Sequence, residues 1–155
     1  MHRPSNVDSK KSLSQAITSL ENLVDDLNIP IIFPIHPRTT AALKRFSIIP
    51  NTDKIRIIDP VGYLEMLLLM QSSKLIITDS GGVQEEACIL RVPCITIRDN
   101  TERPETVVVG ANLVVGTTKE SVINGAKEIL SRPKNWVNPF GDGHTAKHII
   151  DNILS

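Results

Sequence analysis

The sequence has few aromatic side chains and no excess of either charge. Aromatic residues make up only 3% of the 155 residues, and 17 basic side chains are balanced by 17 acidic ones. Single-stranded nucleic acids bind to aromatic stacking platforms, whereas duplexes and anionic membranes bind to basic surfaces. The composition therefore argues against a nucleic-acid or membrane partner, and it predicts a core of Ile, Leu and Val.

Long apolar runs and metal-binding cysteine patterns are missing too. The longest apolar stretch, at residues 64–70, is much shorter than the roughly 20 residues that cross a bilayer. The first 12 residues have no apolar segment of the kind found in signal peptides, so we expect a cytoplasmic protein. Cys88 and Cys94 lie in an apolar region without metal-ligand spacing. This favours buried free thiols over a disulfide.

The rest of the chain alternates between helical and strand-like patterns. Apolar residues at helical spacing predict a helix over residues 12–27 with Ser12 as its N-cap, and a β-branched run predicts a buried strand over residues 29–35. We then expect helices over residues 39–46, 62–72, 82–90, 103–109, 119–131 and 144–154, and strands over residues 55–58, 74–78, 94–97 and 113–115. This order predicts one doubly wound α/β domain with a parallel sheet over residues 1–155, and ligands at the carboxyl ends of its strands.

The most informative segment follows the strand expected at residues 74–78. Asp79 and Ser80 are followed at once by Gly81 and Gly82, where a helix is expected to begin. Glycines allow a ligand to approach closely, free N–H groups at a helix start favour an anion, and Ser80 adds a hydroxyl donor. The same residues also suit a tight strand-to-helix turn with a capping serine. The pattern alone leaves both interpretations open.

A second polar segment, RDNTERPE at residues 98–105, follows the next expected strand. Its two arginines, Arg98 and Arg103, suit a diphosphate because a guanidinium donates two parallel hydrogen bonds. The alternative is a solvated loop of surface salt bridges.

Taken together, the two segments resemble a known family. TDSGGVQEEA at residues 78–87, followed by RDNTERPE, is similar to the signature of non-hydrolysing UDP-N-acetylglucosamine 2-epimerases. Weaker matches are His2-Arg3 with Asn6, PIHP at residues 34–37, VGT at residues 115–117 and NPFGDG at residues 138–143. The resemblance implies the Rossmann-like C-terminal half of a B-type glycosyltransferase-like fold. UDP-N-acetylglucosamine would then bind between this half and another.

The resemblance also implies an activity and a set of site residues. The family's reaction interconverts UDP-N-acetylglucosamine and UDP-N-acetylmannosamine by eliminating UDP and adding it back, without a cofactor or a metal. It serves cell-surface polysaccharide biosynthesis. By the same resemblance, Ser80, Gly81 and Gly82 hold the diphosphate, Glu86 the ribose and Arg103 the departing phosphate, while Tyr63 and Met66 lie near the uracil.

Three N-terminal and loop residues complete the implied set. His2 matches a histidine of the family's catalytic site, beside the sugar and the diphosphate. Arg3 and His36 match residues that contact a second, activating nucleotide-sugar. Two alternatives stay open, a solvated His2 and a structural His36 between two prolines.

The resemblance places the groups that remove and return the C2 proton in a preceding domain, which the sequence given does not contain. We therefore expect the chain alone to bind UDP or UDP-N-acetylglucosamine without epimerising it. Its expected partner is an N-terminal domain or half-chain, within an enzyme that is a homodimer when complete. A stand-alone UDP-sugar-binding module and the donor half of a glycosyltransferase are the alternatives. The TERPE segment argues against the second.

Three further expectations concern the fold. In the family a central strand precedes the His-Arg pair. Without it, the strands at residues 30–35 and 74–78 could pair directly, which we expect, or leave a gap that another chain fills. We expect Trp136 to anchor the proline-rich segment 132–143. His144 and His148 have helical spacing but no third ligand nearby, which favours surface histidines over a metal pair.

Overall fold

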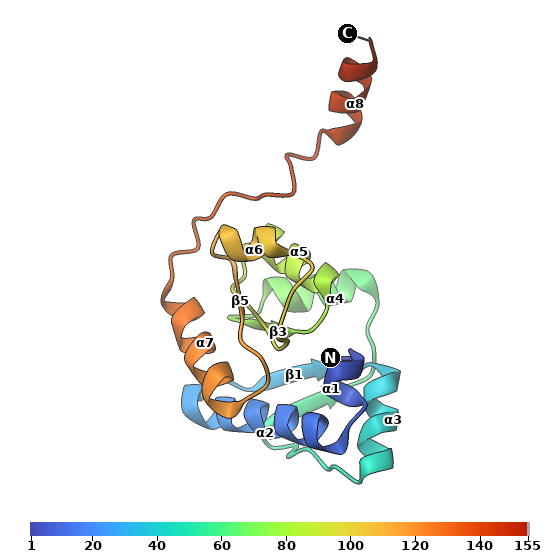
Figure 1. Cartoon of the computed structure of the whole chain (residues 1–155), viewed down its shortest axis with the longest axis vertical. Helices are drawn as coiled ribbons and strands as arrows, with labels where there is room; N and C mark the ends of the chain where they lie inside the picture. The colour runs from blue at the N-terminus through green and yellow to red at the C-terminus, as the bar shows by residue number, and fades with distance from the viewer. Residues whose placement is uncertain (155) are drawn as a thin grey trace.

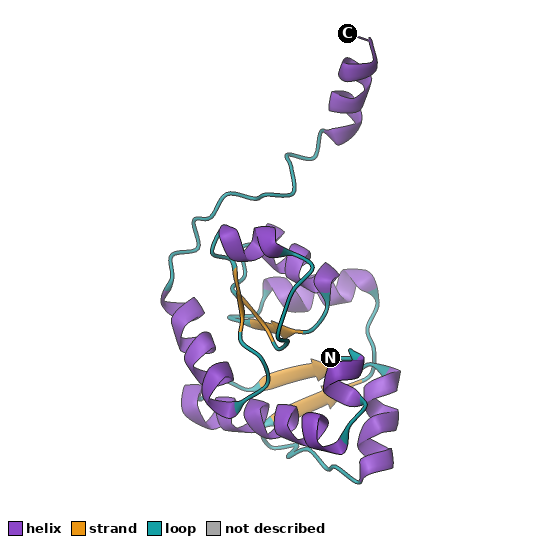
Figure 2. Cartoon of the chain, in the orientation of Figure 1, coloured by secondary structure: helices purple, strands orange, loops and turns teal. Residues whose placement is uncertain are grey.

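The computed structural model describes residues 1–154, which form an α/β fold in which every strand pair is parallel (Figures 1 and 2). The strands are β1 (Ile31–Pro34), β2 (Ile55–Ile58), β3 (Ile76–Thr78), β4 (Cys94–Thr96) and β5 (Asn112–Val114). The helices are α1 (Pro4–Val7), α2 (Lys10–Leu27), α3 (Pro37–Phe46), α4 (Tyr63–Gln71), α5 (Gly81–Ile89), α6 (Pro104–Val108), α7 (Lys119–Ser131) and α8 (Thr145–Leu154). The predicted fold class and the alternation of strands with helices are confirmed.

The start of the first long helix differs from the prediction. Ser9, not Ser12, is the N-cap of α2, because the Ser9 side chain accepts a hydrogen bond from the Ser12 N–H at 3.0 Å. The short helix α1 was not predicted. It begins at Pro4, whose fixed φ suits the first position of a helix.

The strands form two separate sheets instead of one. β1 pairs with β2, with Ile31 opposite Ile55, while β3, β4 and β5 form a second sheet in that order. The expected pairing of β1 with β3 is therefore wrong. Residues of both strands instead line a cavity of about 750 Å³.

The N-terminal segment explains why the two strands stay apart. The Met1 carbonyl accepts a hydrogen bond from Thr39 Oγ1 in α3 at 2.5 Å. The next two backbone N–H groups, of His2 and Arg3, donate to Asp79 after β3. The segment thus lies between the carboxyl ends of β1 and β3 and holds them at a distance.

Helix α2 packs against both halves of the fold. Leu13 and Ile17 belong to a buried cluster with β1, β2 and α3, whereas Leu23 belongs to a second cluster with β4 and α7. The Ser19 hydroxyl also donates to the Thr117 carbonyl, beyond β5, at 2.9 Å. One continuous helix therefore connects two sheets that share no strand pairing.

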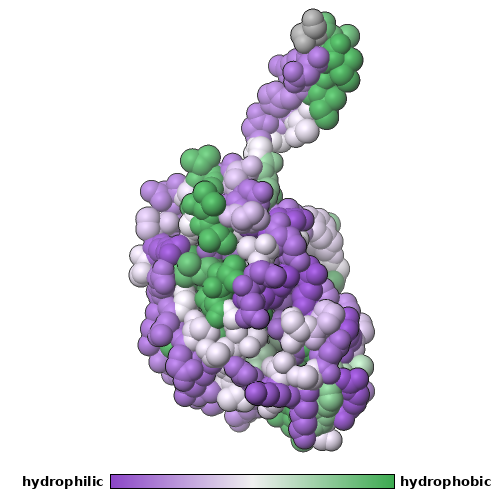
Figure 3. Space-filling view, viewed as in Figure 1, coloured by the Kyte–Doolittle hydropathy of each residue, from purple (hydrophilic) through white to green (hydrophobic). Residues whose placement is uncertain are grey.

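The C-terminal part leaves the body of the molecule. Trp136 is buried and its Nε1 donates to the Cys88 carbonyl at 3.0 Å, so it anchors the proline-rich segment as predicted. Beyond it, α8 projects outward with all its described residues exposed, and its apolar side is visible in Figure 3.

Cys88 and Cys94 are buried free thiols, as expected. Among residues 1–154, no helix is long and apolar enough to cross a membrane.

Candidate functional site

Asp79 organises the residues at the carboxyl end of β3. Its side chain is completely buried, and Oδ2 accepts hydrogen bonds from the backbone N–H groups of His2 at 2.8 Å and Arg3 at 2.9 Å. The Asn6 side-chain amide donates to the same oxygen at 3.1 Å and to the Ile97 carbonyl at 3.0 Å. Asp79 and Asn6 together therefore tie the N-terminal segment to the ends of β3 and β4.

The charge of Asp79 is stabilised by its surroundings. Burial alone would raise the pKa of its carboxyl, but the Met1 ammonium, 3.7 Å from Oδ1, and the N–H groups of Arg3 and His2 lower the pKa below its ordinary value. Burial is also the main reason that the pKa of the His2 imidazole is lowered, with further lowering by the Met1 ammonium, His36 and Arg3, against the attraction of Asp79. His2 therefore favours its neutral form.

Ser80 and the two glycines form the start of α5. Ser80 is the N-cap residue by its backbone conformation, but its hydroxyl makes no capping hydrogen bond within the described chain. This contradicts the capping role considered for that hydroxyl. A Cβ added at Gly82 would meet no described atom within 4 Å, so open space lies beside the first turn of the helix. This is the arrangement that an anion needs to approach free backbone N–H groups.

The charged loop after β4 lies against the same helix. A Cβ added at Gly81 would lie 3.8 Å from Glu102 Oε2 and 3.9 Å from the Arg103 side chain. Within α5, the buried Gln84 side chain accepts hydrogen bonds from Thr101 at 2.5 Å and from Asn112 at 3.2 Å. This polar contact fixes the loop beside the helix start.

The loop side chains form a cluster of ion pairs with residues of α5 and the N-terminal segment. Arg103 pairs with Glu85, while Glu102 is bound by Arg98 at 2.5 and 2.9 Å and lies 3.5 Å from Arg3. Hydrogen bonding by Arg98 is the main reason that the pKa of Glu102 falls to about 2. Three guanidinium groups thus lie among these carboxylates beside the start of α5, with Glu86 next to Glu85 and Asp79 within electrostatic reach of Arg98. Arg103, one of the predicted site residues, contacts α5 through its ion pair with Glu85.

Glu86 lies on α5, one residue beyond the partner of Arg103. Its pKa is raised, first by partial burial and then by the like charge of Glu85. The assignment of ribose binding to Glu86 stays a prediction.

The two implied histidines lie close together. The ring centroids of His2 and His36 are 5.2 Å apart. His36 is the N-cap of α3, and its Nδ1 accepts the Arg38 N–H at 3.1 Å. His36 therefore has a structural role in the chain as it stands, which agrees with the structural alternative for this residue without testing the activator role.

The cavity between the two sheets brings some predicted residues together and leaves others outside. His2, His36, Met66 and Ser80 are among its lining residues. Tyr63, at the start of α4, is 65% exposed and is not one of them. The remaining predicted residues, Arg3, Gly81, Gly82, Glu86 and Arg103, do not line the cavity either.

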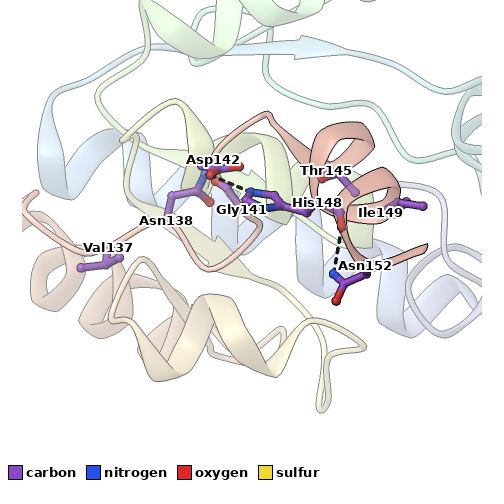
Figure 4. Close-up of a pocket in the computed structure, with 8 residues that line it drawn as sticks. All are labelled: Val137, Asn138, Gly141, Asp142, Thr145, His148, Ile149 and Asn152. Atoms are coloured by element: carbon purple, nitrogen blue, oxygen red, sulfur yellow. Dashed lines mark hydrogen bonds and ion pairs between the residues drawn. The ribbon is translucent and has the colours of Figure 1, made fainter. Parts of the chain in front are cut away.

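A separate hollow lies between α8 and the segment before it, as Figure 4 shows. Its lining includes His148, whose Nε2 lies 3.1 Å from Asp142 Oδ2, whereas His144 is not among the lining residues. Within residues 1–154, no group of three or more His, Cys, Asp or Glu side chains is placed to hold a metal ion.

The family model described as UDP-N-acetylglucosamine 2-epimerase matches residues 1–154. The chain belongs to the UDP-N-acetylglucosamine 2-epimerase family. It is 51% identical over 153 residues to the UDP-N-acetylglucosamine 2-epimerase of Methanocaldococcus jannaschii. This match covers 97% of this chain and 42% of that protein. It is 49% identical over 157 residues to the same-named protein of Methanococcus maripaludis, covering 99% of this chain and 43% of that one.

A solved structure supports the same membership of the 2-epimerase family. The crystal structure of the Methanocaldococcus jannaschii enzyme in complex with UDP-N-acetylglucosamine and UDP matches with a TM-score of 0.91 and 50% identity. The match covers 99% of this chain and 43% of that one. The resemblance drawn from the two motifs is thus confirmed, and the chain spans less than half the length of these relatives.

Sequence reasoning missed the central role of Asp79. It lies within the family motif, but the prediction used only the neighbouring Ser80, Gly81 and Gly82. Asn6 was noted as a match and was given no task. A signal was present, because a carboxylate directly after an apolar strand must find donors if it is buried.

Proposed function

We propose that this chain is the nucleotide-sugar-binding part of a UDP-N-acetylglucosamine 2-epimerase, and that it binds UDP and UDP-N-acetylglucosamine by itself. The observation that carries the proposal is the open start of α5. There Gly82 leaves space, Ser80 has a hydroxyl free of capping, and a cluster that contains three arginines lies alongside. Such a site provides backbone N–H donors and positive potential for a diphosphate.

The proposed roles follow the arrangement of the elements. Ser80, Gly81 and Gly82 would hold the diphosphate at the α5 start, while Arg103 exchanges its Glu85 partner for the departing phosphate. Glu86 would bind the ribose hydroxyls further along the helix. The uracil would lie towards α4, near Tyr63 and Met66.

The N-terminal residues have a proposed place beside the sugar. The neutral imidazole of His2, held through its backbone by Asp79, would lie at the sugar and diphosphate. Arg3 and His36 would contact a second, activating nucleotide-sugar.

Catalysis would require more groups than the described site supplies. Removing and returning the C2 proton needs a positioned base and acid, each worth about 10²–10⁴-fold in rate. We propose that they come from the rest of a homodimeric enzyme, in the cytoplasm, and that its UDP-N-acetylmannosamine product feeds cell-surface polysaccharide biosynthesis. The isolated chain should then bind nucleotide and show no epimerase activity.

Titration calorimetry of the chain with UDP in EDTA tests binding. We expect binding without a divalent ion, because the α5 start and the arginines already supply the positive potential. Uridine is the control ligand, and it should bind more weakly because it has no diphosphate. No heat at millimolar UDP, or heat only with Mg²⁺, would contradict the proposal. Conversion of UDP-N-acetylglucosamine to UDP-N-acetylmannosamine by the chain alone would contradict the expected inactivity.

A further inference from the structure

Buried polar side chains connect α5 and α6 with the second sheet. Gln84 of α5, Thr96 of β4, Thr106 of α6 and Asn112 of β5 are each 0% exposed. Residues of these types are mostly exposed in proteins, because burying a polar group costs free energy unless it is hydrogen-bonded. Four of them in four neighbouring elements therefore call for a common explanation.

Hydrogen bonds join these side chains into one network. Asn112 Nδ2 donates to Gln84 Oε1 at 3.2 Å and to Thr106 Oγ1 at 3.1 Å. Asn112 Oδ1 accepts the Thr96 hydroxyl at 2.9 Å. The Thr101 hydroxyl, in the loop after β4, donates to Gln84 Oε1 at 2.5 Å. The network thus links the loop to both helices and to two strands.

Two threonines of the network hold the backbone of Arg103 from both sides. The Arg103 N–H donates to Thr101 Oγ1 at 3.0 Å, and the Arg103 carbonyl accepts the Thr106 hydroxyl at 2.7 Å. Regular structure does not set this conformation, because Arg103 precedes α6 with a φ of −127° and a ψ of 60°, neither helical nor extended. The two hydroxyls therefore fix the backbone from which the guanidinium extends.

Gln84 connects this arginine to the start of α5. Its backbone N–H donates to the Ser80 carbonyl at 3.3 Å, within the first turn of the helix. Its side chain accepts the Thr101 hydroxyl, and Thr101 in turn accepts the Arg103 N–H. One residue thus bonds to both parts of the proposed diphosphate site, which are the α5 start and the arginine loop.

We propose that Gln84 and Thr101 are positioning residues, which hold the guanidinium of Arg103 where it can bind the same diphosphate as the α5 start. The inference rests on the proposed nucleotide site and adds residues that act through Arg103. A guanidinium binds phosphate through N–H groups in a fixed planar arrangement, so a displaced backbone weakens these bonds. The ion pair of Arg103 with Glu85 is partly exposed, and such pairs are too weak to fix the loop alone.

The test compares two substitutions of Thr101 that differ in the hydroxyl. Thr101→Val keeps the shape and removes both hydrogen bonds, whereas Thr101→Ser keeps the hydroxyl. Calorimetry of the whole chain with UDP and with uridine gives the ratio of the two affinities. We expect Thr101→Val to weaken UDP binding about three- to tenfold and uridine binding little, while Thr101→Ser binds UDP nearly as the wild type does.

A double-mutant cycle shows whether Thr101 acts through Arg103. If it does, Thr101→Val should change UDP binding little in the Arg103→Ala background, because the group that it positions is gone. A residue that only stabilises the fold would weaken UDP binding equally in both backgrounds. The matched control is Thr40→Val, at a half-buried threonine of α3 whose hydroxyl makes no hydrogen bond within residues 1–154, and it should leave UDP binding unchanged.

Amide hydrogen exchange gives a second readout, which needs no nucleotide. The Arg103 N–H should exchange about threefold faster or more in Thr101→Val, since its acceptor is lost, and at nearly the wild-type rate in Thr101→Ser.

Three results would overturn the inference and leave the proposed function intact. The first is a wild-type ratio of UDP to uridine affinity in Thr101→Val. The second is an equal loss of UDP affinity with and without the Arg103 side chain. The third is wild-type exchange of the Arg103 N–H in Thr101→Val. A wild-type chain that does not bind UDP would overturn the proposed function and this inference together.

Discussion

Replacing Asp79 by alanine should destabilise the fold more than an ordinary surface substitution. The change removes a fully buried acceptor from two backbone N–H groups and from Asn6, and it leaves the Met1 ammonium without its counter-charge. Removing one partner of a buried ion pair costs about 3–5 kcal/mol. Since each kcal/mol lowers Tm by about 2–4 °C in a chain of this size, we expect a fall of about 6–20 °C.

Thermal unfolding by circular dichroism measures this effect against matched variants. Asp53→Ala, at an exposed aspartate whose side chain makes no hydrogen bond or ion pair within residues 1–154, should melt within about 2 °C of the wild type. Asp79→Asn keeps the shape and one acceptor oxygen but loses the charge, so its loss should be intermediate. If Asp79→Ala melts as high as Asp53→Ala, the carboxylate does not hold the N-terminal segment in place.

The charge of Asp79 also predicts that the stability of the fold depends on pH. The folded pKa of Asp79 lies below its ordinary value of 3.8. The unfolded chain therefore binds this proton more readily, and the stabilisation is complete above that ordinary value and lost as pH falls through the folded pKa. The difference in Tm between the wild type and Asp79→Asn should be constant near about pH 6 and shrink below about pH 4.

Two further predictions use the nucleotide site and the thiols. Arg103→Ala should weaken UDP binding by about tenfold or more and uridine binding little, as measured by calorimetry. Glu86→Ala should weaken the binding of both ligands alike. If both variants lose the same ligands to the same extent, the assigned roles are wrong. Cys88 and Cys94 should react slowly with a thiol reagent in the folded chain and rapidly in guanidinium, because burial raises the pKa of both thiols; rapid reaction in the folded chain would show that this core opens.

The sequence predicted the elements better than the contacts between them. Apolar periodicity and turn residues located the helices and strands, because both depend on neighbours along the chain. The choice of Ser12 as N-cap failed because Ser9, three residues earlier, provides the oxygen that accepts the Ser12 N–H. Helix boundaries of this kind depend on one local hydrogen bond that several nearby serines could make.

The separation of the sheets could not be predicted from local pattern. Direct pairing of β1 and β3 was expected because unpaired edges are costly, but Met1, His2 and Arg3 lie between the strand ends and bond to Thr39 and Asp79. These contacts join residues up to 77 positions apart in sequence. For the candidate site, the family motifs predicted the start of α5 and Arg103, whose roles stay predictions, whereas the contacts of Asp79 required the three-dimensional structure.

The exposed position of α8 has a consequence for how the chain unfolds. A helix of 10 residues is marginal in water without tertiary packing, and all of its described residues are exposed. Its backbone hydrogen bonds therefore open independently of the body, with a local free energy close to zero. A protease that cuts the segment between Phe140 and α8 would release this end first, and the two sheets would then unfold at an unchanged temperature. Stability measured on the whole chain thus describes the part up to Phe140, which packs against the cluster of Trp136.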